Sequence, residues 1–465
     1  MNRYRDNPAA IRSLVRPEAI HRDLYLDPEL FDLEMERLWR RTWIYVGHDS
    51  QVPQAGDFYS TQIGRDPVIM VRGADARVRV LPNRCAHKGT RLVSAVHGTC
   101  PAGMIRCPYH GWTYRLDGSL RTVPLKGGYE GTGFEHSGAS RGLVELSSVN
   151  YRGFVFARAS AEGAGFHEYF GDSLSSIDNL VDRSPEGRLE VAGGALRYLH
   201  DCNWKMYVEN LNDAMHPMVA HESSAGTAKR LWEAAPPGSP TPMVIEQFVP
   251  FVNGYDFFEK MGVKIYENGH SYTGVNFSIH SHYSSVGEYE QRMVAAYGEE
   301  RARRILGETR HNTIYYPSLT IKGAIQSIRV ARPLSVDRTL IESWTFRLAG
   351  APDDLLARTV TYSRLINAPT SMVGHDDLHC YHAIQEGLAS SASEWVSLHR
   401  NHTDAEVTQL AGTYGATNEI PIRGQYRAWA DIMTGGAPAG PGASAGGGAI
   451  AGGGAIAPGG GSGDT

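Results

Sequence analysis

NRCAHKG at residues 83–89 and IRCPYHGWTYRLDG at residues 105–118 are the two segments that decide the fold. Each carries one cysteine and one histidine followed by a glycine, and 19 residues separate the two pairs. Two thiolates and two imidazoles on paired loops form a four-ligand metal set. The four residues are Cys85, His87, Cys107 and His110.

Two kinds of metal centre fit this set. A structural zinc ion takes four such ligands around one point, whereas a two-iron, two-sulfur cluster takes the histidines on one iron and the cysteines on the other. Each loop here mixes one thiolate with one imidazole, which favours the cluster over a zinc finger. His97 and Cys100 lie between the loops, but neither precedes a Gly-Trp turn like the one after His110, so we assign them no metal.

The residues around the loops predict a small all-β domain. From Ile44 onward, short runs of β-branched and aromatic residues alternate with glycine, proline and asparagine, up to the run NYRGFVFARA at residues 150–159. This pattern is typical of short strands joined by turns. On the amino-terminal side, Asp27 and Pro28 have the residue types of an N-cap and a first helical position, so a helix is expected there.

A second group of metal-ligating residues lies in NWKMYVENLNDAMHPMVAH, residues 203–221. The apolar spacing predicts a helix that places Asp213 and His216 on neighbouring faces and that Pro217 ends, so that His221 reaches back from the following turn. Two imidazoles need one carboxylate to complete a facial triad, which binds iron(II) and leaves sites open for dioxygen.

Both groups resemble one known family, the aromatic ring-hydroxylating oxygenases. The two loops and the strand run after them are similar to that family's Rieske domain, and Asn210, Asp213, His216 and His221 match its catalytic motif N-x-x-D-x-x-H-x-x-x-x-H. The resemblance implies a Rieske [2Fe-2S] cluster on Cys85, His87, Cys107 and His110.

In that family the aspartate of the motif is a bridge and not a ligand. The resemblance therefore implies that Asp213 joins His216 to His110 of a neighbouring protomer and carries electrons over that path. His216 and His221 would bind a mononuclear Fe(II), and Asn210 would lie near its open face without binding it.

The third iron ligand must then come from elsewhere. Residues 372–388, MVGHDDLHCYHAIQEGL, read as a helix similar to the family's late acidic helix. Asp377 is expected in the first turn of this helix, and the distance from Asp377 to Gln385 favours it over Asp376 as the third ligand. A competing interpretation is a zinc site made by three histidines on one helix face, His375, His379 and His382.

The whole sequence predicts an α+β protein. We expect an amino-terminal helical segment at 1–43, a Rieske domain at 44–160, a catalytic iron domain at 161–434 and a disordered Gly/Ala-rich tail at 435–465, in which GGGAIA occurs twice. In the catalytic domain, helices are expected near 166–182, 203–216, 286–305, 352–366 and 375–390, and strands within 242–252, 271–281, 319–333 and 339–350.

The resemblance implies a terminal oxygenase that uses O2 to hydroxylate an aromatic carboxylate, most simply by cis-dihydroxylation. The flanking segments look like large subunits that act on acids such as benzoate, salicylate, anthranilate and terephthalate. Arg329 and Arg332 are candidates to bind the substrate carboxylate, with a surface role equally open for each. Two alternatives remain open: a Rieske monooxygenase, that is a ring hydroxylase or a demethylase, and a non-catalytic iron-sulfur electron carrier or zinc-stabilised binding protein.

The implied partners follow from the same reasoning. No GxGxxG motif follows a strand, so electrons from NAD(P)H must arrive through a separate reductase, with or without a ferredoxin. The bridging role of Asp213 requires a ring of subunits, and the resemblance implies a homotrimer, with a small β subunit common in this branch.

Composition excludes several other classes. The 465 residues include 45 basic and 50 acidic ones, a net charge of −5 without the basic excess that binds nucleic acid or anionic lipid. No apolar stretch approaches about 18 residues, and the amino terminus lacks the apolar core of a signal peptide, so a cytoplasmic protein without a membrane span is expected. Five cysteines in so long a chain fit ligands and free thiols and not a disulfide framework.

Overall fold

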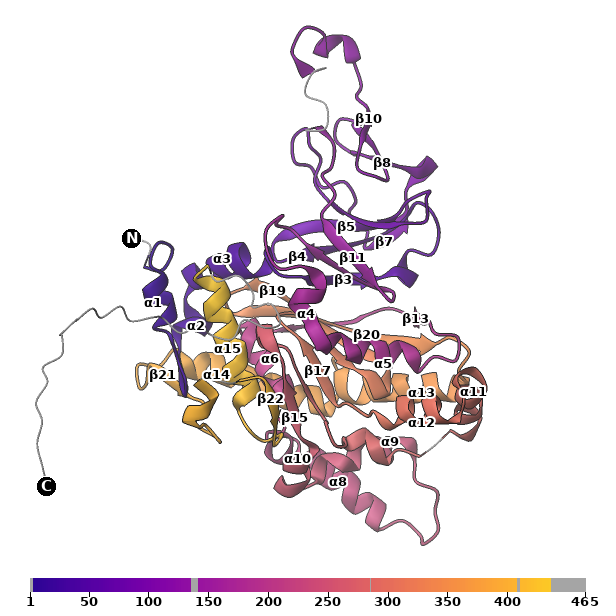
Figure 1. Cartoon of the computed structure of the whole chain (residues 1–465), viewed down its shortest axis with the longest axis vertical. Coiled ribbons are helices and arrows are strands. Elements are labelled where there is room, and N and C mark those ends of the chain that lie inside the picture. The colour runs from indigo at the N-terminus through magenta and orange to yellow at the C-terminus, as the bar shows by residue number, and fades with distance from the viewer. Residues whose placement is uncertain (1–2, 135–140, 285, 408–409, 436–465) are drawn as a thin grey trace, which may run out of the picture.

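The computed structural model describes residues 3–134, 141–284, 286–407 and 410–435. Figure 1 shows a small β domain, which ends in a narrow tip near β8 and β10, standing on a larger domain of helices packed around a long sheet. The α+β class is therefore confirmed. Apart from Gly435, the tail for which we predict disorder lies outside the described residues.

The β domain consists of three antiparallel sheets, whose strands are joined by glycine-containing turns. In chain order within each sheet, the strands are β3 (Ile44–His48), β11 (Ser147–Tyr151) and β12 (Phe154–Arg158); β4 (Asp57–Ile63), β5 (Asp66–Arg72), β6 (Val78–Pro82) and β7 (His97–Thr99); and β8 (Met104–Arg106), β9 (Thr113–Arg115) and β10 (Leu120–Thr122).

The amino-terminal segment packs on the larger domain. Asp27 caps α3 by accepting hydrogen bonds from the backbone amides of Glu29 and Leu30, as its place before Pro28 predicts. A small sheet ties the segment to the later chain through the register Ile20↔Val396. The elements are α1 (Pro8–Arg12), β1 (Val15–Arg16), β2 (Ala19–His21), α2 (Asp23–Leu26), α3 (Pro28–Glu34), the π-helix η1 (Met35–Trp39) and the distant strand β21 (Trp395–Ser397).

One nine-stranded antiparallel sheet forms the centre of the larger domain. Its path is β13-β20-β19-β18-β17-β16-β15-β22, and β14 also pairs with β20. The strands are β13 (Leu189–Val191), β14 (Leu196–His200), β15 (Val263–Ile265), β16 (Ser271–Thr273), β17 (Asn312–Tyr315), β18 (Leu319–Lys322), β19 (Ser327–Ser335), β20 (Arg338–Leu348) and β22 (Gly412–Tyr414).

Helices cover this sheet and supply most of the residues discussed below. They are α4 (Phe166–Phe170), α5 (Ser175–Asp182), α6 (Trp204–Asn212), α7 (Pro217–Ala220), α8 (Glu222–Glu233), α9 (Met243–Phe248), α10 (Tyr255–Met261), α11 (Gly287–Tyr297), α12 (Glu299–Gly307), α13 (Asp353–Tyr362), the π-helix η11 (Ser363–Asn367), α14 (Met372–Leu388) and α15 (Ile420–Met433).

Two predicted strands are wrong or too long. Residues 242–252 form α9 and the 3-10 helix η7 (Val249–Val252), because Gln247, Phe248 and Phe251 bury one helical face while β-branched Val244 stays exposed. The strand expected within 271–281 stops at Thr273, where Gly274 takes a φ of 91° that ends the extended run.

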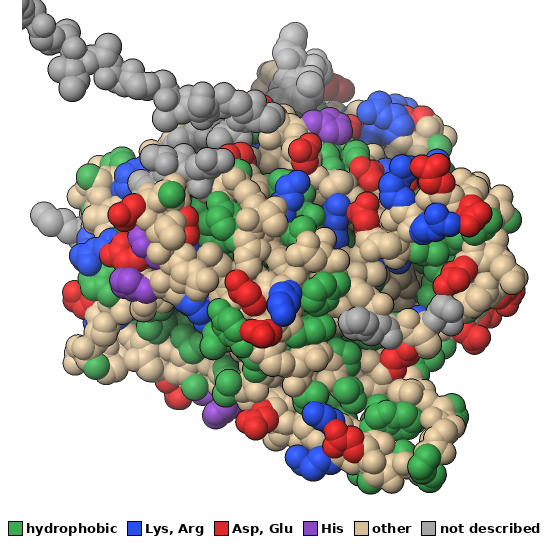
Figure 2. All heavy atoms as spheres, turned by 60° about the horizontal axis from the view of Figure 1, so that its bottom comes forward, with side chains coloured by type: hydrophobic (Ala, Val, Ile, Leu, Met, Phe, Trp, Pro, Cys, Tyr) green, Lys and Arg blue, Asp and Glu red, His purple; other side chains and the backbone are tan. Residues whose placement is uncertain are grey.

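Charges are mixed on the molecular surface. On the face drawn in Figure 2, acidic and basic side chains are interspersed and no large area carries one sign alone. Among the described helices, none combines the length and the apolarity that a membrane span requires.

Candidate functional site

The two cysteine-histidine loops adopt the same turn. Gly89 donates its backbone N–H to the carbonyl of Cys85 at 2.9 Å, and Gly111 donates to the carbonyl of Cys107 at 3.1 Å. Both glycines have a positive φ, 76° and 70° respectively, which a residue with a side chain adopts only at a cost. The glycine after each pair is thus explained, and each loop presents one thiol and one imidazole in the same way.

Both thiols of these loops are buried, while His110 is exposed. Cys85 Sγ lies 3.1 Å from the hydroxyl of Tyr114, and the imidazoles of His87 and His110 approach to 4.7 Å between ring centroids. Trp112 stacks on His87 at 4.8 Å with an interplanar angle of 4° and holds that ring in place. Sulfur therefore faces the protein and one imidazole faces outward.

The positions of the four side chains separate the two metal interpretations. A single zinc ion needs its four ligand atoms within about 4 Å of one another, given bond lengths of about 2.0 to 2.3 Å. Within the described residues, three or more His, Cys, Asp or Glu ligand atoms come within 4.8 Å of one another only at His216, His221 and Asp377. The loop residues thus do not converge on one ion, and their two pairs fit a cluster whose two irons lie apart.

The other two possible ligands of the β domain lie elsewhere. His97 belongs to β7 and pairs with Tyr59 of β4. Burial raises the pKa of the Cys100 thiol to about 11, so that it stays protonated and is a poor ligand. Neither residue sits in the repeated glycine turn.

A second set of side chains meets in the larger domain. Oδ1 of Asp377 lies 3.7 Å from Nε2 of His216 and 3.5 Å from Nε2 of His221. Burial lowers the pKa of His216 and favours the neutral imidazole that a metal requires. Two imidazoles and one carboxylate at these separations form the donor set of a 2-His-1-carboxylate iron site.

The backbone reaches this arrangement differently from the sequence prediction. The helix predicted to continue to His216 ends at Asn212, and Asp213 is its extended C-cap. Pro217 begins α7 and does not end α6, since a proline fits the first position of a helix, where no intrahelical N–H is needed. Asp213 and His216 therefore meet across a turn.

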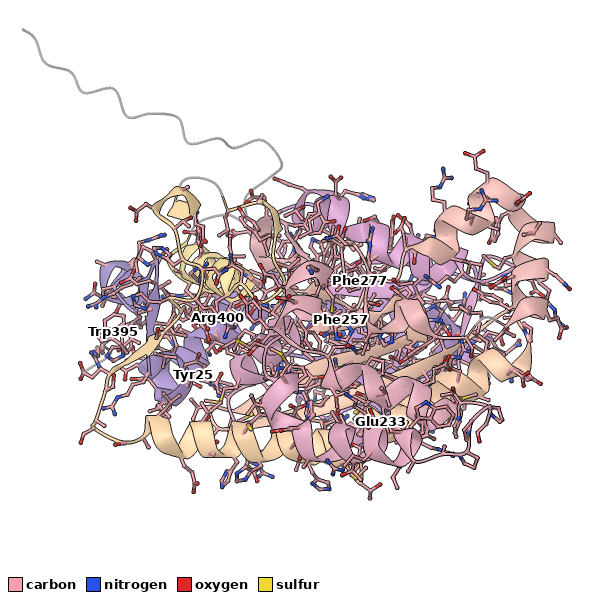
Figure 3. All side chains as sticks on the ribbon, turned by 90° about the horizontal axis from the view of Figure 1, so that it is seen from below. Tyr25, Glu233, Phe257, Phe277, Trp395 and Arg400 are labelled. Carbon is pink, nitrogen blue, oxygen red and sulfur yellow. The ribbon has the colours of Figure 1, made fainter. Side chains whose placement is uncertain are left out.

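The carboxylate of Asp213 is close to His216 but makes no hydrogen bond to its imidazole in the single chain. Its Oδ2 lies 4.0 Å from Nδ1 of His216, a buried nitrogen that has no hydrogen-bond partner among the described residues. Its Oδ1 accepts from the backbone of Met215 at 2.7 Å and lies 3.4 Å from a guanidinium nitrogen of Arg400, which Figure 3 labels.

Helix α14 spans the predicted residues, Met372–Leu388, but places Asp377 in its second turn and not in its first. Its cap explains this start, because Ser371 accepts the backbone N–H of Gly374 at 3.0 Å. Asp376 contacts the site as well: its Oδ2 lies 3.1 Å from Nδ1 of His221. The two neighbouring aspartates thus approach opposite nitrogens of one imidazole.

The alternative zinc site on the same helix does not form. Within the described chain, the side chains of His375, His379 and His382 do not bring three ligand atoms close enough together to bind one metal ion. His379 and His382 are exposed, and His382 faces Glu386 at 3.6 Å. These histidines belong to the outer face of α14.

A cavity of about 50 Å³ opens beside the three converging residues. Asn210 lines it and donates to Oδ1 of Asp377 at 3.2 Å. The remaining wall is largely apolar, but it also carries two cations, Lys322 and Arg329. From the sequence, Arg329 is one of two candidates to bind the substrate carboxylate, and Lys322 is not among them. Arg332, the other candidate, lies outside the cavity and pairs with Glu342 at 3.2 Å.

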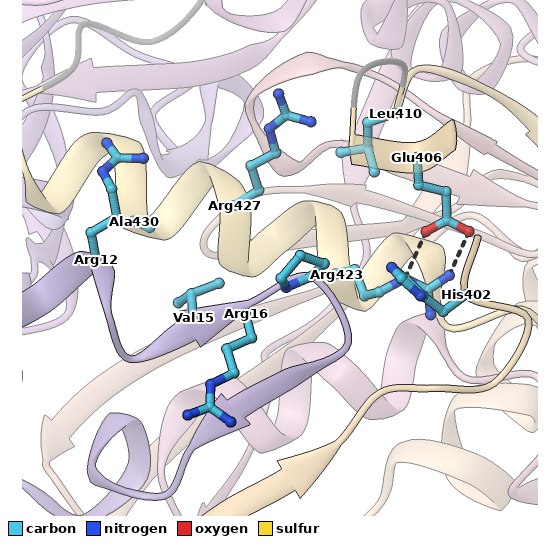
Figure 4. A pocket seen from close by; sticks show the side chains of 10 residues that line it. Arg12, Val15, Arg16, His402, Glu406, Leu410, Arg423, Arg427 and Ala430 are labelled. Carbon is cyan, nitrogen blue, oxygen red and sulfur yellow. Dashed lines mark hydrogen bonds and ion pairs between the residues drawn. The ribbon is translucent and has the colours of Figure 1, made fainter. Parts of the chain in front are cut away.

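Another pocket lies between the amino-terminal segment and α15 (Figure 4). Its most buried polar residues already satisfy each other, because Arg423 makes two hydrogen bonds to Glu406, at 2.7 and 2.8 Å. Arg12, at its rim, pairs with Asp431 at 2.9 Å. No convergence of metal-binding side chains occurs there among the described residues, so we assign the chemistry to the cavity beside Asp377.

Comparison with known families places the two sites in two known domains. Residues 42–131 match the Rieske [2Fe-2S] domain, and residues 189–435 match the catalytic domain of the ring-hydroxylating alpha subunit. The first range contains both glycine-turn loops, and the second contains His216, His221 and Asp377.

Several curated relatives resemble the whole chain. The alpha subunit of toluate 1,2-dioxygenase from Pseudomonas putida is 32% identical, over 82% of this chain and 81% of its own length. The large subunit of 2-halobenzoate 1,2-dioxygenase from Burkholderia cepacia is 31% identical, over 84% of each chain. The large subunit of anthranilate 1,2-dioxygenase from Acinetobacter baylyi is 29% identical.

Solved structures share the fold. Naphthalene 1,2-dioxygenase with bound indole covers 90% of this chain at a TM-score of 0.72 and 23% identity. A quaternary ammonium Rieske monooxygenase covers 93% of it at 0.64 and 17% identity. The fold is thus common to a dioxygenase and a monooxygenase.

Proposed function

The chain belongs to the Rieske-type ring-hydroxylating oxygenase alpha subunits, and on that basis we propose that it is a terminal oxygenase that hydroxylates an aromatic carboxylate. The observation that carries this proposal is the presence, in one chain, of two cysteine-histidine glycine turns and of a convergent His216, His221 and Asp377. An electron carrier or a zinc-stabilised binding protein needs only the first of these.

The two donor sets would hold different groups. A [2Fe-2S] cluster would be bound by the thiolates of Cys85 and Cys107 and by the imidazoles of His87 and His110, and a mononuclear Fe(II) by His216, His221 and Asp377. When bound, the cluster and the iron supply the two electrons and the open coordination sites that the reduction of O2 requires.

The protein's own residues orient these donors. The hydroxyl of Tyr114, 3.1 Å from Cys85 Sγ, can donate a hydrogen bond to the thiolate. Asp376 accepts from Nδ1–H of His221, which leaves the lone pair on Nε2. Asn210, by donating to Oδ1 of Asp377, restricts the rotation of that carboxylate at the cavity wall.

The substrate class rests on the relatives and on the cavity. The three relatives above are named for toluate, 2-halobenzoate and anthranilate, all aromatic carboxylates. The cavity is smaller than the roughly 150 Å³ known to hold benzene in a protein core, so we propose that apolar residues of its wall, such as Phe251 and Ile366, move outward to admit the ring. Cis-dihydroxylation is the reaction we propose, because these relatives are named dioxygenases.

Assembly follows from the place of the two sites. The Cys107 loop lies between β8 and β9, and Figure 1 shows β8, together with β10 that pairs with β9, in the upper part of the β domain, far from α6. We propose that Asp213 bridges His216 to His110 of another protomer in a homotrimer, and that electrons come from NAD(P)H through a reductase, with or without a ferredoxin. A small β subunit is compatible with this assembly.

Turnover under ¹⁸O2 tests the function. The purified protein, a reductase and NADH are incubated with benzoate, salicylate, anthranilate and terephthalate, and products are analysed by mass spectrometry. Two labelled atoms in a cis-diol support the proposal, and one labelled atom would show a monooxygenase. Absence of label from every product of an iron-loaded, reducible protein would contradict an oxygenase acting on these acids.

A further inference from the structure

Lys322 is a buried cation without a counterion. It ends β18, only 4% of it is exposed, and it lines the cavity beside the iron-binding residues. Its one hydrogen-bond partner among the described residues is Nε2 of His311, at 3.4 Å. Burial and the nearby charge of Arg329 lower the pKa of Lys322 well below its usual value.

Arg329 is a second cation on the same wall. The register of β18 and β19 pairs Thr320 with Arg329, and alternation along β18 puts Lys322 on the same face, so the two cations are diagonal neighbours. Arg329 lies over the ring of Tyr207, 5.8 Å from its centroid, and 3.5 Å from the amide oxygen of Asn312. No described carboxylate forms an ion pair with either cation.

Other buried cations of the described chain have acceptors: Arg158 and Arg183 donate to backbone carbonyls, and others pair with carboxylates. Lys205 has Glu34 at 2.6 Å, and Arg423 has Glu406 at 2.7 Å. An unsatisfied buried charge costs several kcal/mol, and among the described residues the ammonium of Lys322 has neither a carboxylate nor a backbone carbonyl as acceptor, only His311 at 3.4 Å. The exception lies in the cavity wall and therefore points to a ligand.

The neighbouring polar groups are donors too. Nε2 of His311 accepts from Lys322, which leaves the proton on Nδ1, a nitrogen without a partner among the described residues. The hydroxyl of Tyr362 lines the same cavity and also has no described partner. A wall that offers an ammonium, a guanidinium, an N–H and an O–H suits a ligand group that only accepts, which is an ionised carboxylate.

We propose that Lys322 and Arg329 form an anion subsite that binds the carboxylate of an aromatic acid, with its ring lying toward His216, His221 and Asp377. This inference rests on the proposed function and deepens it. Neutral aromatic compounds would leave both cations unpaired in the cavity, so the subsite selects for acids.

Binding to the anaerobic holoenzyme tests the subsite without turnover. Calorimetry compares benzoate, salicylate and terephthalate with benzamide, a neutral analogue of benzoate. The wild type is expected to bind at least one acid more tightly than benzamide. Lys322→Met should weaken binding of that acid about 30-fold or more and leave benzamide unchanged, because it removes one partner of a buried charge pair. Lys264→Met, on β15 of the same sheet and outside the cavity, is the matched control.

Arg329→Met should also weaken binding of the acid. Lys322→Gln is a second variant that removes the charge, so that a folding defect in Lys322→Met cannot account for the loss of binding. Equal affinity for acids and benzamide, or acid binding that survives in both Lys322 variants with intact cluster spectra, would overturn the subsite. Lys322-dependent binding without ¹⁸O in any product would leave the subsite standing and contradict the oxygenase. Oxygenation of neutral aromatics that does not depend on Lys322 would contradict the subsite and leave the oxygenase standing.

Discussion

Oδ2 of Asp376 lies 3.1 Å from Nδ1 of His221, on the side of the imidazole opposite to Asp377. A carboxylate in this position fixes the tautomer and the orientation of a histidine that binds metal through its other nitrogen. Both neighbouring aspartates therefore contact the same imidazole, that of His221. In the proposed site, Asp377 would offer an oxygen to the metal, and Asp376 would orient His221 to bind it.

Asp376→Ala should lower the iron affinity of the triad by about 10- to 100-fold, the usual effect of removing such a partner. Asp377→Ala should lower it further, because a ligand is lost. Iron titration of the protein with its cluster intact measures both. Asp354→Ala, an exposed aspartate of α13, is the control. Unchanged affinity in both Asp376→Ala and Asp377→Ala would show that iron binds elsewhere.

Asp213→Ala should keep both metal centres and lose nearly all coupled turnover. The side chain is not among the donors that converge, but it lies 4.0 Å from the unpartnered Nδ1 of His216. Steady-state product formation, with iron and sulfide content measured in the same preparation, checks this. Asp201→Ala, which removes an exposed carboxylate near Arg338, serves as the control. Substantial turnover in Asp213→Ala would rule out the bridging role.

Cys107→Ser and Cys100→Ser form a matched pair in the β domain, since both thiols are buried in the same apolar cluster. Cys107 sits in a glycine turn and Cys100 does not, so only the first substitution should abolish the cluster. The visible spectrum and acid-labile sulfide report the outcome. Loss of the cluster in Cys100→Ser, with its retention in Cys107→Ser, would reassign the ligands.

Glu209 makes stability depend on pH. Burial raises its pKa from 4.5 to about 7, while Tyr25 and Tyr426 donate to its Oε1. Because the pKa of Glu209 is higher in the folded state than in the unfolded state, the protonated acid stabilises the fold below pH 4.5, and this contribution is lost as the pH rises through about 7. The loss amounts to at most about 3 kcal/mol.

Glu209→Gln should lack that dependence. The free energy of unfolding of the wild type, measured by denaturant titration between pH 5 and pH 8, should fall relative to that of the variant and then level off above pH 7. Parallel pH profiles for the two proteins would mean that Glu209 has an ordinary pKa.

The parts of the site that the sequence predicts well are local. A cysteine, a histidine and a glycine within five residues build the turn of each loop, because the glycine supplies the positive φ that closes it. The helix over Met372–Leu388 is likewise predicted from its own residues, but its first turn is not, because the cap at Ser371 places Asp377 in the second turn and not in the expected first turn.

The rest depends on contacts between distant segments. In the sequence, Lys322 is an ordinary lysine in a predicted strand. Only the packing of β17, β19 and α13 around it places it in the cavity wall. The role of Asp376 follows from the position of His221, more than 150 residues away, across the α7–α14 contact. The strand expected at 242–252 fails because spacing along a helix buries Gln247, Phe248 and Phe251, while Val244 faces solvent.

Metal and sulfide analysis of the purified protein, with an electron paramagnetic resonance spectrum after reduction, tests the central claim most directly. The account predicts two irons and two acid-labile sulfides for the cluster, one further iron for His216, His221 and Asp377, and a rhombic signal on reduction. Stoichiometric zinc without sulfide would contradict it.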